Sequence, residues 1–424
     1  MSNCPFQLQG MLDIAFRYSE RHKYQIHPQK TMITTLVDEK HLLPHIEERK
    51  WHLGDKNVTN SESFVHLGLN WVKGRPAPDV SKLIQSARRT AYMLMKVGLH
   101  GVDGLGPATS FKLVKTYITP KLLYGLEATV LKKKEIDMIE SFFRRLLRQL
   151  QSLPESTAKE AIYLLLGATT IESQYHLKVL TLFGSICRLP PSHHLHLLCR
   201  RQLAVRMDMK NSWLSLVANI GERYNINIYK QLLYPWPKIT WKRYIRQSIK
   251  EHCHEELCRS AAEKTSLKYL LIHDTYPTLH QNWYNIGFQK TEAAGVRARM
   301  LVGRYRCETL NAKFQPDHST LCRMCKSADE DILHVIAICP ATEHIRRPTA
   351  EKLKDIYRRN NITGPSTKEE FCLAILNGGR FKKKHLTSYK NQDLSVISQI
   401  SGAFCLNIER YRSSFTMNNV NNVI

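Results

Sequence analysis

The residues best suited to do chemistry are three cysteines and one histidine close together in the chain, Cys322, Cys325, His334 and Cys339. Their spacing is C-x2-C-x8-H-x4-C. Two cysteines three residues apart can face one ion from a tight turn, and a histidine and a cysteine five apart can complete a tetrahedron from a short helix. Zinc favours such a donor set in closed, four-coordinate structural sites. The sequence therefore predicts a structural zinc site; the alternative is that these are core residues of the apolar segment 332–338.

Two other groups are weaker candidates for a metal site. His254 and Cys258 lie four residues apart, so a helix would place them on one face, but no C-x2-C turn accompanies them. His193, His194 and His196 follow a proline turn, and a hydrated helix start is the favoured explanation, because the imidazoles need not converge on one point. We expect neither group to bind a metal.

Basic residues are the second chemical feature. Lys and Arg number 62 against 37 Asp and Glu, giving a formal net charge of +25, which predicts an anionic partner such as a nucleic-acid backbone. Lys238, Lys242, Arg246 and Lys250 recur every four residues as a cationic ridge beside an apolar ridge of Trp241, Ile245 and Ile249. Trp236 and Tyr244 lie close enough in sequence to stack a base. An ordinary amphipathic helix with a solvated face is the alternative.

Further basic residues flank the predicted zinc site. They are Arg297, Arg299, Arg304 and Arg306 before it and Lys382-Lys383-Lys384 after it. Taken together, they favour contact with RNA or DNA. The acidic run Asp329-Glu330-Asp331 lies inside the zinc loop and is expected to face solvent. No Asp-Asp doublet occurs, so the sequence shows no carboxylate pair for two-metal phosphoryl transfer.

Composition defines the class of protein. The chain has 424 residues, of which 43% are hydrophobic and 23% charged, as in folded proteins. Eleven cysteines are too few for a disulfide scaffold. The longest apolar run, around Ile162–Ala168, is far shorter than the ~20 residues that span a bilayer. With no secretory signal at the N-terminus, a nuclear or cytoplasmic location without membrane contact is expected.

The hydrophobic periodicity predicts a mainly α protein with a small β portion. Helical stripes cover 8–16, 83–95, 107–118 and 136–150, strands are expected at 32–37 and 64–71, and residues 150–285 are mostly helical. Pro190-Pro191 and Tyr234–Pro237 are the expected internal boundaries. The glycine-rich segment 98–106 is predicted to be a connector, because no strand leads into it and no Gly-Lys-Ser/Thr ends it.

Several segments carry a family resemblance. They are Leu8–Ser19 with Ile26-His27-Pro28-Gln29-Lys30-Thr31 after it, Phe64-Val65-His66-Leu67-Gly68, Gly106–Ser110, Tyr117–Glu127, and the cysteine–histidine set followed by Pro340. In this order they resemble the C-terminal portion of LINE-type (non-long-terminal-repeat) retrotransposon reverse transcriptases. His27 stands where that family usually has Asn.

The resemblance implies a partial palm, a helical thumb and connector, and a small zinc-binding module. The corresponding ranges are 1–75 (end of the palm), 76–150 (thumb), 151–284 (connector), 285–345 (zinc module) and 346–424 (basic C-terminal segment). The fingers and the strand with the metal-binding aspartates would precede Met1. The chain alone is therefore expected to be inactive as an RNA-directed DNA polymerase, and Mg²⁺ would serve only the intact enzyme, with the missing N-terminal half as a partner.

The resemblance also assigns roles to individual residues. Lys30 would neutralise or protonate departing pyrophosphate at the polymerase site, and a surface turn is its alternative role. The residues that would place the primer end or track the template–primer duplex are Phe64, Leu67, Gly68, Arg88, Arg89 and Lys112. Two other functions stay open: a stand-alone nucleic-acid-binding protein derived from such an element, and a helical scaffold whose charge serves only solubility.

Overall fold

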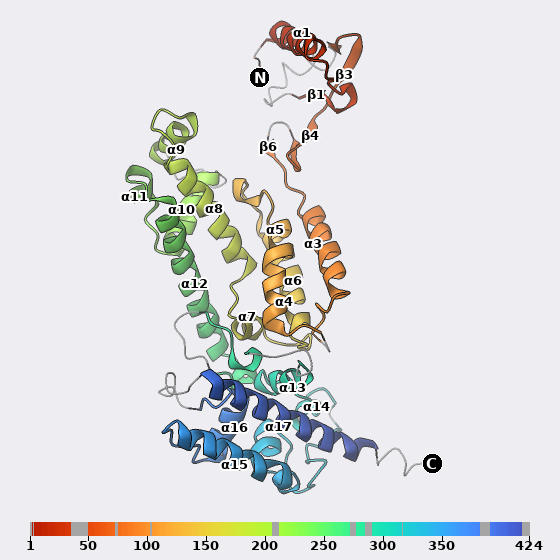
Figure 1. Ribbon diagram of the computed structural model, residues 1–424, viewed down its shortest axis with the longest axis vertical. Coiled ribbons are helices and arrows are strands. Elements are labelled where there is room, and N and C mark those ends of the chain that lie inside the picture. Colours follow the sequence, from red (N-terminus) through yellow and green to blue (C-terminus); the bar gives the residue numbers. More distant parts are fainter. Residues whose placement is uncertain are drawn as a thin grey trace. The chain divides into compact units, whose positions relative to one another are not determined.

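A computed structural model of the chain describes residues 2, 4–34, 50–72, 75–101, 104–205, 212–271, 277–284, 291–315, 317–381 and 391–417. The protein is mainly helical with two small three-stranded sheets, as the sequence predicts (Figure 1). It divides into two compact units, residues 1–82 with 125–131, and residues 83–124 with 132–424. The expected strand residues 35–37 and the run Lys382–Lys384 lie outside the described residues.

The smaller unit is built on helix α1 (Pro5–Arg21), which has proline in its first turn. A short sheet has the order β1 (Met32–Ile33), β3 (Lys56–Asn60), β2 (Trp51–Leu53). One face of α1 packs on this sheet through Leu8, Leu12 and Phe16, which cover a core of Ile33, Trp51, Leu53 and Val58. The 3-10 turns η1 (Pro28–Lys30) and η3 (Leu126–Ala128) also belong to this unit, as does a second sheet.

The single strand predicted over 64–71 is wrong, because the chain turns back in its middle. Strands β4 (Ser63–His66) and β5 (Leu69–Val72) pair antiparallel, and β6 (Arg75–Pro76) joins β5. Leu67 and Gly68 form the connection with φ of 51° and 77°. Positive φ at both central residues is the requirement of a tight two-residue hairpin. The alternation of apolar and polar residues in the sequence continues through the turn, so periodicity alone predicts a single strand.

The larger unit begins with a group of helices. Their bounds are α3 (Val80–Met95), α4 (Pro107–Leu113), η2 (Val114–Ile118), α5 (Thr119–Leu122), α6 (Lys133–Leu150), α7 (Lys159–Leu166), α8 (Ile171–Cys187), α9 (His194–Val205), α10 (Trp213–Arg223), α11 (Ile228–Leu233) and α12 (Lys238–Ala262). The predicted helix over 107–118 is confirmed, with η2 as a π-helical turn. The stripe predicted in α6 is also confirmed, since Ile139, Phe143, Leu146, Leu147 and Leu150 are buried.

Helix α12 is held against α8 at a close crossing. A Cβ added to Gly184 of α8 would lie 2.1 Å from Nε1 of Trp241 in α12, so glycine is needed there. The buried Trp241 indole donates a hydrogen bond of 2.9 Å to the carbonyl oxygen of Leu180. This contact fixes the direction of α12, on which the cationic ridge lies.

The remaining elements surround the cysteine–histidine set. They are η4 (Thr265–Leu267), η5 (Gln281–Trp283), α13 (Thr291–Leu301), α14 (Glu308–Asn311), η7 (His334–Ile338), η8 (Pro340–Thr342), α15 (Glu343–Arg359), α16 (Lys368–Leu376) and α17 (Asn391–Met417). Helix α17 packs along α13 and α15. None of the described helices combines the length and the apolar composition that crossing a bilayer requires.

Candidate metal centre

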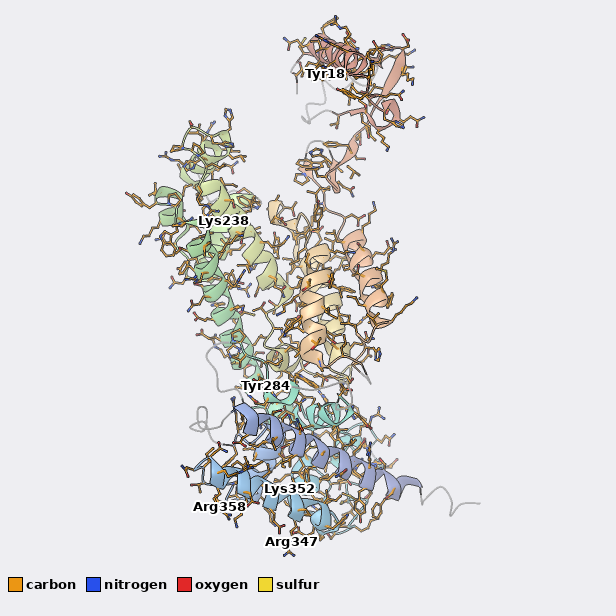
Figure 2. The ribbon with its side chains drawn as sticks, in the orientation of Figure 1. Tyr18, Lys238, Tyr284, Arg347, Lys352 and Arg358 are labelled. Atoms are coloured by element: carbon orange, nitrogen blue, oxygen red, sulfur yellow. The ribbon has the colours of Figure 1, made fainter. Side chains whose placement is uncertain are left out.

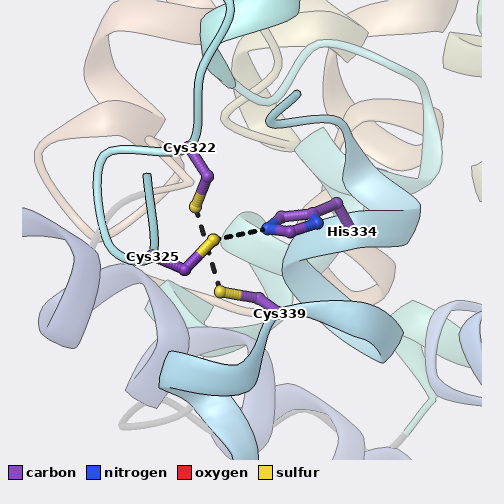
Figure 3. A group of neighbouring side chains, drawn as sticks. All are labelled: Cys322, Cys325, His334 and Cys339. Atoms are coloured by element: carbon purple, nitrogen blue, oxygen red, sulfur yellow. Dashed lines mark hydrogen bonds between the residues drawn. The ribbon is translucent and has the colours of Figure 1, made fainter. Parts of the chain in front are cut away.

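The four predicted ligands meet at one point, as Figure 3 shows, and we call them the CCHC cluster. All four donor atoms lie within 4.8 Å of one another. The Sγ atoms of Cys322 and Cys339 are 3.9 Å apart, and Sγ of Cys325 lies 3.3 Å from Nε2 of His334. A tetrahedral ion with bonds to sulfur of about 2.3 Å needs sulfur–sulfur edges of about 3.8 Å. The cluster can therefore hold a tetrahedral metal ion, and the predicted grouping is confirmed.

A tight turn presents the first two ligands. The amide of Cys322 donates to the carbonyl oxygen of Ala328 at 2.8 Å. The amide of Lys326 donates to the carbonyl oxygen of Cys322 at 2.9 Å. Lys326 takes a positive φ of 56°, which closes the turn directly after Cys325. Both cysteine side chains thus leave the same side of one loop.

A π-helical turn presents the other two ligands. The amide of His334 donates to the Asp331 carboxylate at 2.7 Å, which caps the start of η7. The amide of Cys339 donates to the His334 carbonyl oxygen at 2.7 Å. The Thr342 hydroxyl and the Arg346 guanidinium each donate to the Cys339 carbonyl oxygen at 3.0 Å. Helix α15 is thereby anchored to the last ligand.

The four ligands differ in burial and in proton affinity. Cys322 and Cys339 are fully buried, and His334 is 4% exposed. Burial raises the pKa of Cys322 to about 12. Burial acts in the same direction on Cys325, but hydrogen bonds from Ser327 and to His334 outweigh it and lower that pKa to about 6. Cys325 therefore ionises first and offers the first thiolate to an incoming cation.

Behind the cluster lies a buried group of charges that the sequence does not reveal. The Arg412 guanidinium, on α17, donates to Glu330 at 2.8 Å and to Glu308 at 3.0 Å. Glu330 also accepts hydrogen bonds of 3.2 Å from the amides of Glu308 and Arg323. The expectation that the acidic run 329–331 faces solvent is wrong for Glu330, which is fully buried.

Glu308 is the second carboxylate of this group. Besides Arg412, it pairs with Arg323 of the metal loop and with His318. Burial opposes ionisation of Glu308, but the hydrogen bonds from His318 and Arg323 lower its pKa overall. We call Glu308, Glu330, Arg323 and Arg412 the inner ion group. It links the metal loop to α17, because burying any one of these charges without its partner of opposite charge would strongly destabilise the fold.

The weaker metal candidates do not form sites among the described residues. Sγ of Cys258 lies 3.4 Å from Nε2 of His254, but within the ranges given above only the CCHC cluster gathers three or more ligand side chains. Burial raises the pKa of Cys258 to about 11, so it is not a reactive thiolate.

Arg297, predicted to contact nucleic acid, is a core residue instead. It is fully buried. Its guanidinium bonds the Asn282 side chain and donates to the carbonyl and hydroxyl oxygens of Ser398 at 2.9 Å each. Burial lowers its pKa to about 10. The prediction for Arg297 is wrong because α17 covers this face of α13. Arg299 and Arg304 are half-buried.

The predicted cationic ridge lies on α12. Its apolar neighbours Trp241, Ile245 and Ile249 are buried, as predicted. Lys238 and Arg246 are exposed, and Lys242 and Lys250 are half-buried.

The ridge also lies within electrostatic reach of a second basic element, which the sequence did not connect with it. Partial burial and the nearby charges of Lys250 and Lys112 lower the pKa of Lys115, whose side chain is exposed. Lys112 was predicted as a duplex contact, whereas Lys115 was missed, although it lies one helical turn further along the same face. We call Lys112, Lys115 and Lys250 the lysine cluster.

The remaining predicted contacts are distributed over both units. In the smaller unit, Lys30 is exposed at the end of η1, and Phe64 stacks on Trp71 in the β4–β5 hairpin, with ring centroids 6.0 Å apart. Leu67, at the turn before Gly68, is 75% exposed. In the larger unit, Arg88 and Arg89 are exposed on α3.

Comparison with known proteins adds no further assignment to these observations. No protein-family model matches the chain, and no curated protein matches it.

Proposed function

We propose that the chain binds the phosphate backbone of a nucleic acid through its larger unit, with a structural zinc ion in the CCHC cluster. The lysine cluster is the observation that carries this proposal. In it, Lys115 of η2 lies within the electrostatic reach of Lys112, from α4, and of Lys250, from the sequence-distant helix α12. Like charges gathered from two segments repel one another, and a bound polyphosphate removes that cost.

A second basic surface supports the same partner. Helix α15 carries Arg347, Lys352 and Arg358, all exposed, and Figure 2 labels them along this helix. Arg347 and Arg358 make only solvent-exposed ion pairs within the helix, of 3.5 and 3.4 Å. Such pairs are weak and exchange readily for phosphate. Because α15 is anchored to the Cys339 carbonyl, metal binding also stabilises this basic helix.

Zinc is the ion that the donor set favours. Three sulfurs and one imidazole suit Zn²⁺ better than Mg²⁺ or Ca²⁺, which take oxygen ligands. Four protein ligands around one ion fill its tetrahedral positions, and three of them are buried. No open position is then left for a reacting water, so the role that follows is structural.

A salt series tests the nucleic-acid proposal. We expect the full chain to bind labelled RNA or DNA with an affinity that falls steeply as salt increases. Replacing Lys112, Lys115 and Lys250 with Gln should lower the slope of log K against log salt by about 0.7–0.9 for each phosphate that is no longer neutralised. The measurement is filter binding at several salt concentrations.

Three exposed lysines outside the lysine cluster, Lys132, Lys133 and Lys134, provide the control. Their replacement with Gln removes the same net charge and should leave the slope of the wild type nearly unchanged. Wild-type binding that is absent, or independent of salt, would contradict the proposal and favour the helical scaffold.

We further propose, from the resemblance, that the chain is the C-terminal portion of a retrotransposon reverse transcriptase. It would bind template RNA and primer DNA and polymerise only with the part that carries the aspartates. The alternative is a stand-alone nucleic-acid-binding protein derived from such an element. The missing Asp-Asp doublet in the sequence fits both.

Primer extension with Mg²⁺ tests the catalytic part of this proposal. We expect no incorporation of nucleotides by this chain alone, because two-metal phosphoryl transfer needs a carboxylate pair. Extension that appears only when an aspartate-bearing reverse transcriptase half is added would favour the first proposal over the second. Incorporation by the chain alone would show that it holds a carboxylate pair of its own.

A further inference from the structure

We propose that the cavity between the α10–α11 loop and Tyr244 of α12 holds an unpaired nucleotide of a single-stranded nucleic acid, with its base on Tyr244 and its phosphate on the outer face of α12. This inference rests on the proposed nucleic-acid binding and names the form of nucleic acid that the chain prefers.

The cavity itself is the first observation. It has a volume of about 320 Å³ and is lined by residues of α10, of the loop that follows it, of α11 and of α12. Those with polar side chains are Glu222, Asn225, Asn227, Tyr229 and Tyr244. The walls thus combine aromatic rings with a carboxylate and amides. This is the chemistry that holds a flat heterocycle with donors and acceptors on its edge.

The ring of Tyr244 is held in place by two tryptophans. Its centroid lies 5.1 Å from that of Trp236 and 6.2 Å from that of Trp241. Tyr234, directly after α11, and Ile239, at the start of α12, are 73% and 72% exposed. An aromatic ring that lines an open cavity and contacts two other rings is a stacking platform for a base, which every base can use.

The charged residues near the cavity favour the base at one place and the phosphate at another. Glu222 is exposed at the wall, where it would repel a phosphate but accept a hydrogen bond from a base amino group. Arg243 and Arg246 lie on the exposed face of α12, on either side of Tyr244 in sequence. Lys238, labelled near the start of α12 in Figure 2, extends the same basic surface.

The cavity selects for a single strand because it takes a base out of its stack. A base inside a duplex is covered on both faces and reaches such a cavity only at the expense of unstacking and unpairing. An unpaired base avoids most of this cost. The lysine cluster, in contrast, would contact only phosphates, which single strands and duplexes both offer.

A matched pair of variants tests this inference in the full chain. Tyr244→Leu removes the aromatic face but keeps most of the apolar volume, whereas Tyr244→Phe keeps the ring. The probes are a labelled 12-nucleotide single strand, as RNA and as DNA, and the blunt duplex of that strand with its complement. We expect Tyr244→Leu to bind both single strands about 5- to 150-fold more weakly than wild type, the range for one stacked base. Duplex affinity and all affinities of Tyr244→Phe should stay within twofold of wild type.

Fluorescence of Trp236 gives a second, independent signal. A base stacked on Tyr244 lies close to this indole, so single strands should quench its emission, and a Trp236→Phe variant should lose that part of the quenching. Equal losses for single strand and duplex, or unchanged binding by Tyr244→Leu, would overturn the platform but leave the proposed function standing. If the wild type binds no probe at low salt, the proposed function itself fails.

Discussion

A Cys322→Ser/Cys325→Ser double variant is expected to lose its bound zinc and the ordered structure of residues 315–345. The wild type should contain one zinc ion per chain. Two remaining ligands cannot close a tetrahedron, and in zinc-finger peptides the apparent binding energy of about 10–16 kcal/mol is also folding energy. The measurements are metal content by mass spectrometry and amide hydrogen exchange along the chain.

The loss should be local. Helices α6, α8 and α12 form contacts of their own in the same unit, so their exchange protection should persist in the double variant. A Cys258→Ser variant is the control, since this half-buried cysteine lies beside His254, outside the CCHC cluster. It should retain one zinc ion. Equal zinc content in the double variant and the wild type would refute the site.

Acid should release the metal from the wild type. The ligands bind zinc as thiolates and neutral imidazole, so binding a metal displaces protons, and a falling pH returns them. Burial raises the pKa of Cys322 to about 12, which makes its thiolate dependent on the bound cation. Cys325, with a pKa of about 6, depends least on the bound cation to form its thiolate.

The second large effect is expected from Arg412→Met. Arg412 is 5% exposed and neutralises two buried carboxylates, Glu330 and Glu308. Removing one partner of a buried ion pair typically costs about 3–5 kcal/mol, because the other charge stays buried without compensation. We expect a loss of this order in the free energy of unfolding, with faster hydrogen exchange in α17. Urea titration and exchange mass spectrometry measure both.

Two comparisons isolate the inner ion group in this experiment. Arg410→Met, two residues away, removes only an exposed pair with Glu292 and should cost less than about 1 kcal/mol. Adding Glu330→Gln to Arg412→Met should recover part of the loss, because the two residues contact each other. Strictly additive effects, or equal losses for both arginine variants, would rule out the group as the link between the metal loop and α17.

Local patterns were sufficient to predict much of this fold. The apolar stripe of α6 and the C-x2-C-x8-H-x4-C spacing depend on residues close in sequence, and the structure confirms both. The hairpin at Leu67 was missed for the opposite reason. The sequence goes on alternating between apolar and polar residues through the two-residue turn, although the pairing of Phe64 with Trp71 shifts by one the residues that share a face, so periodicity does not reveal the reversal.

The failures at charged residues have a different cause. Arg297 is covered by Ser398, 101 residues further along the chain, and Glu330 by Arg412, 82 residues further. An arginine at a helix position looks the same in sequence whether solvent or a distant helix covers it. The lysine cluster is hidden in the same way, since only the folded chain brings Lys250 within electrostatic reach of Lys115. Long-range packing decides which charges stay at the surface.

The inner ion group also sets an order of events for a chain growing on the ribosome. All four metal ligands are made before Arg412, which follows the last of them by 73 residues (412 − 339 = 73). Until that arginine emerges, Glu330 in the nascent loop lacks its counter-charge. The folded loop is therefore less stable at this stage. We expect chelators to remove the metal ion readily from the nascent loop, and the ion to be bound tightly only after α17 docks.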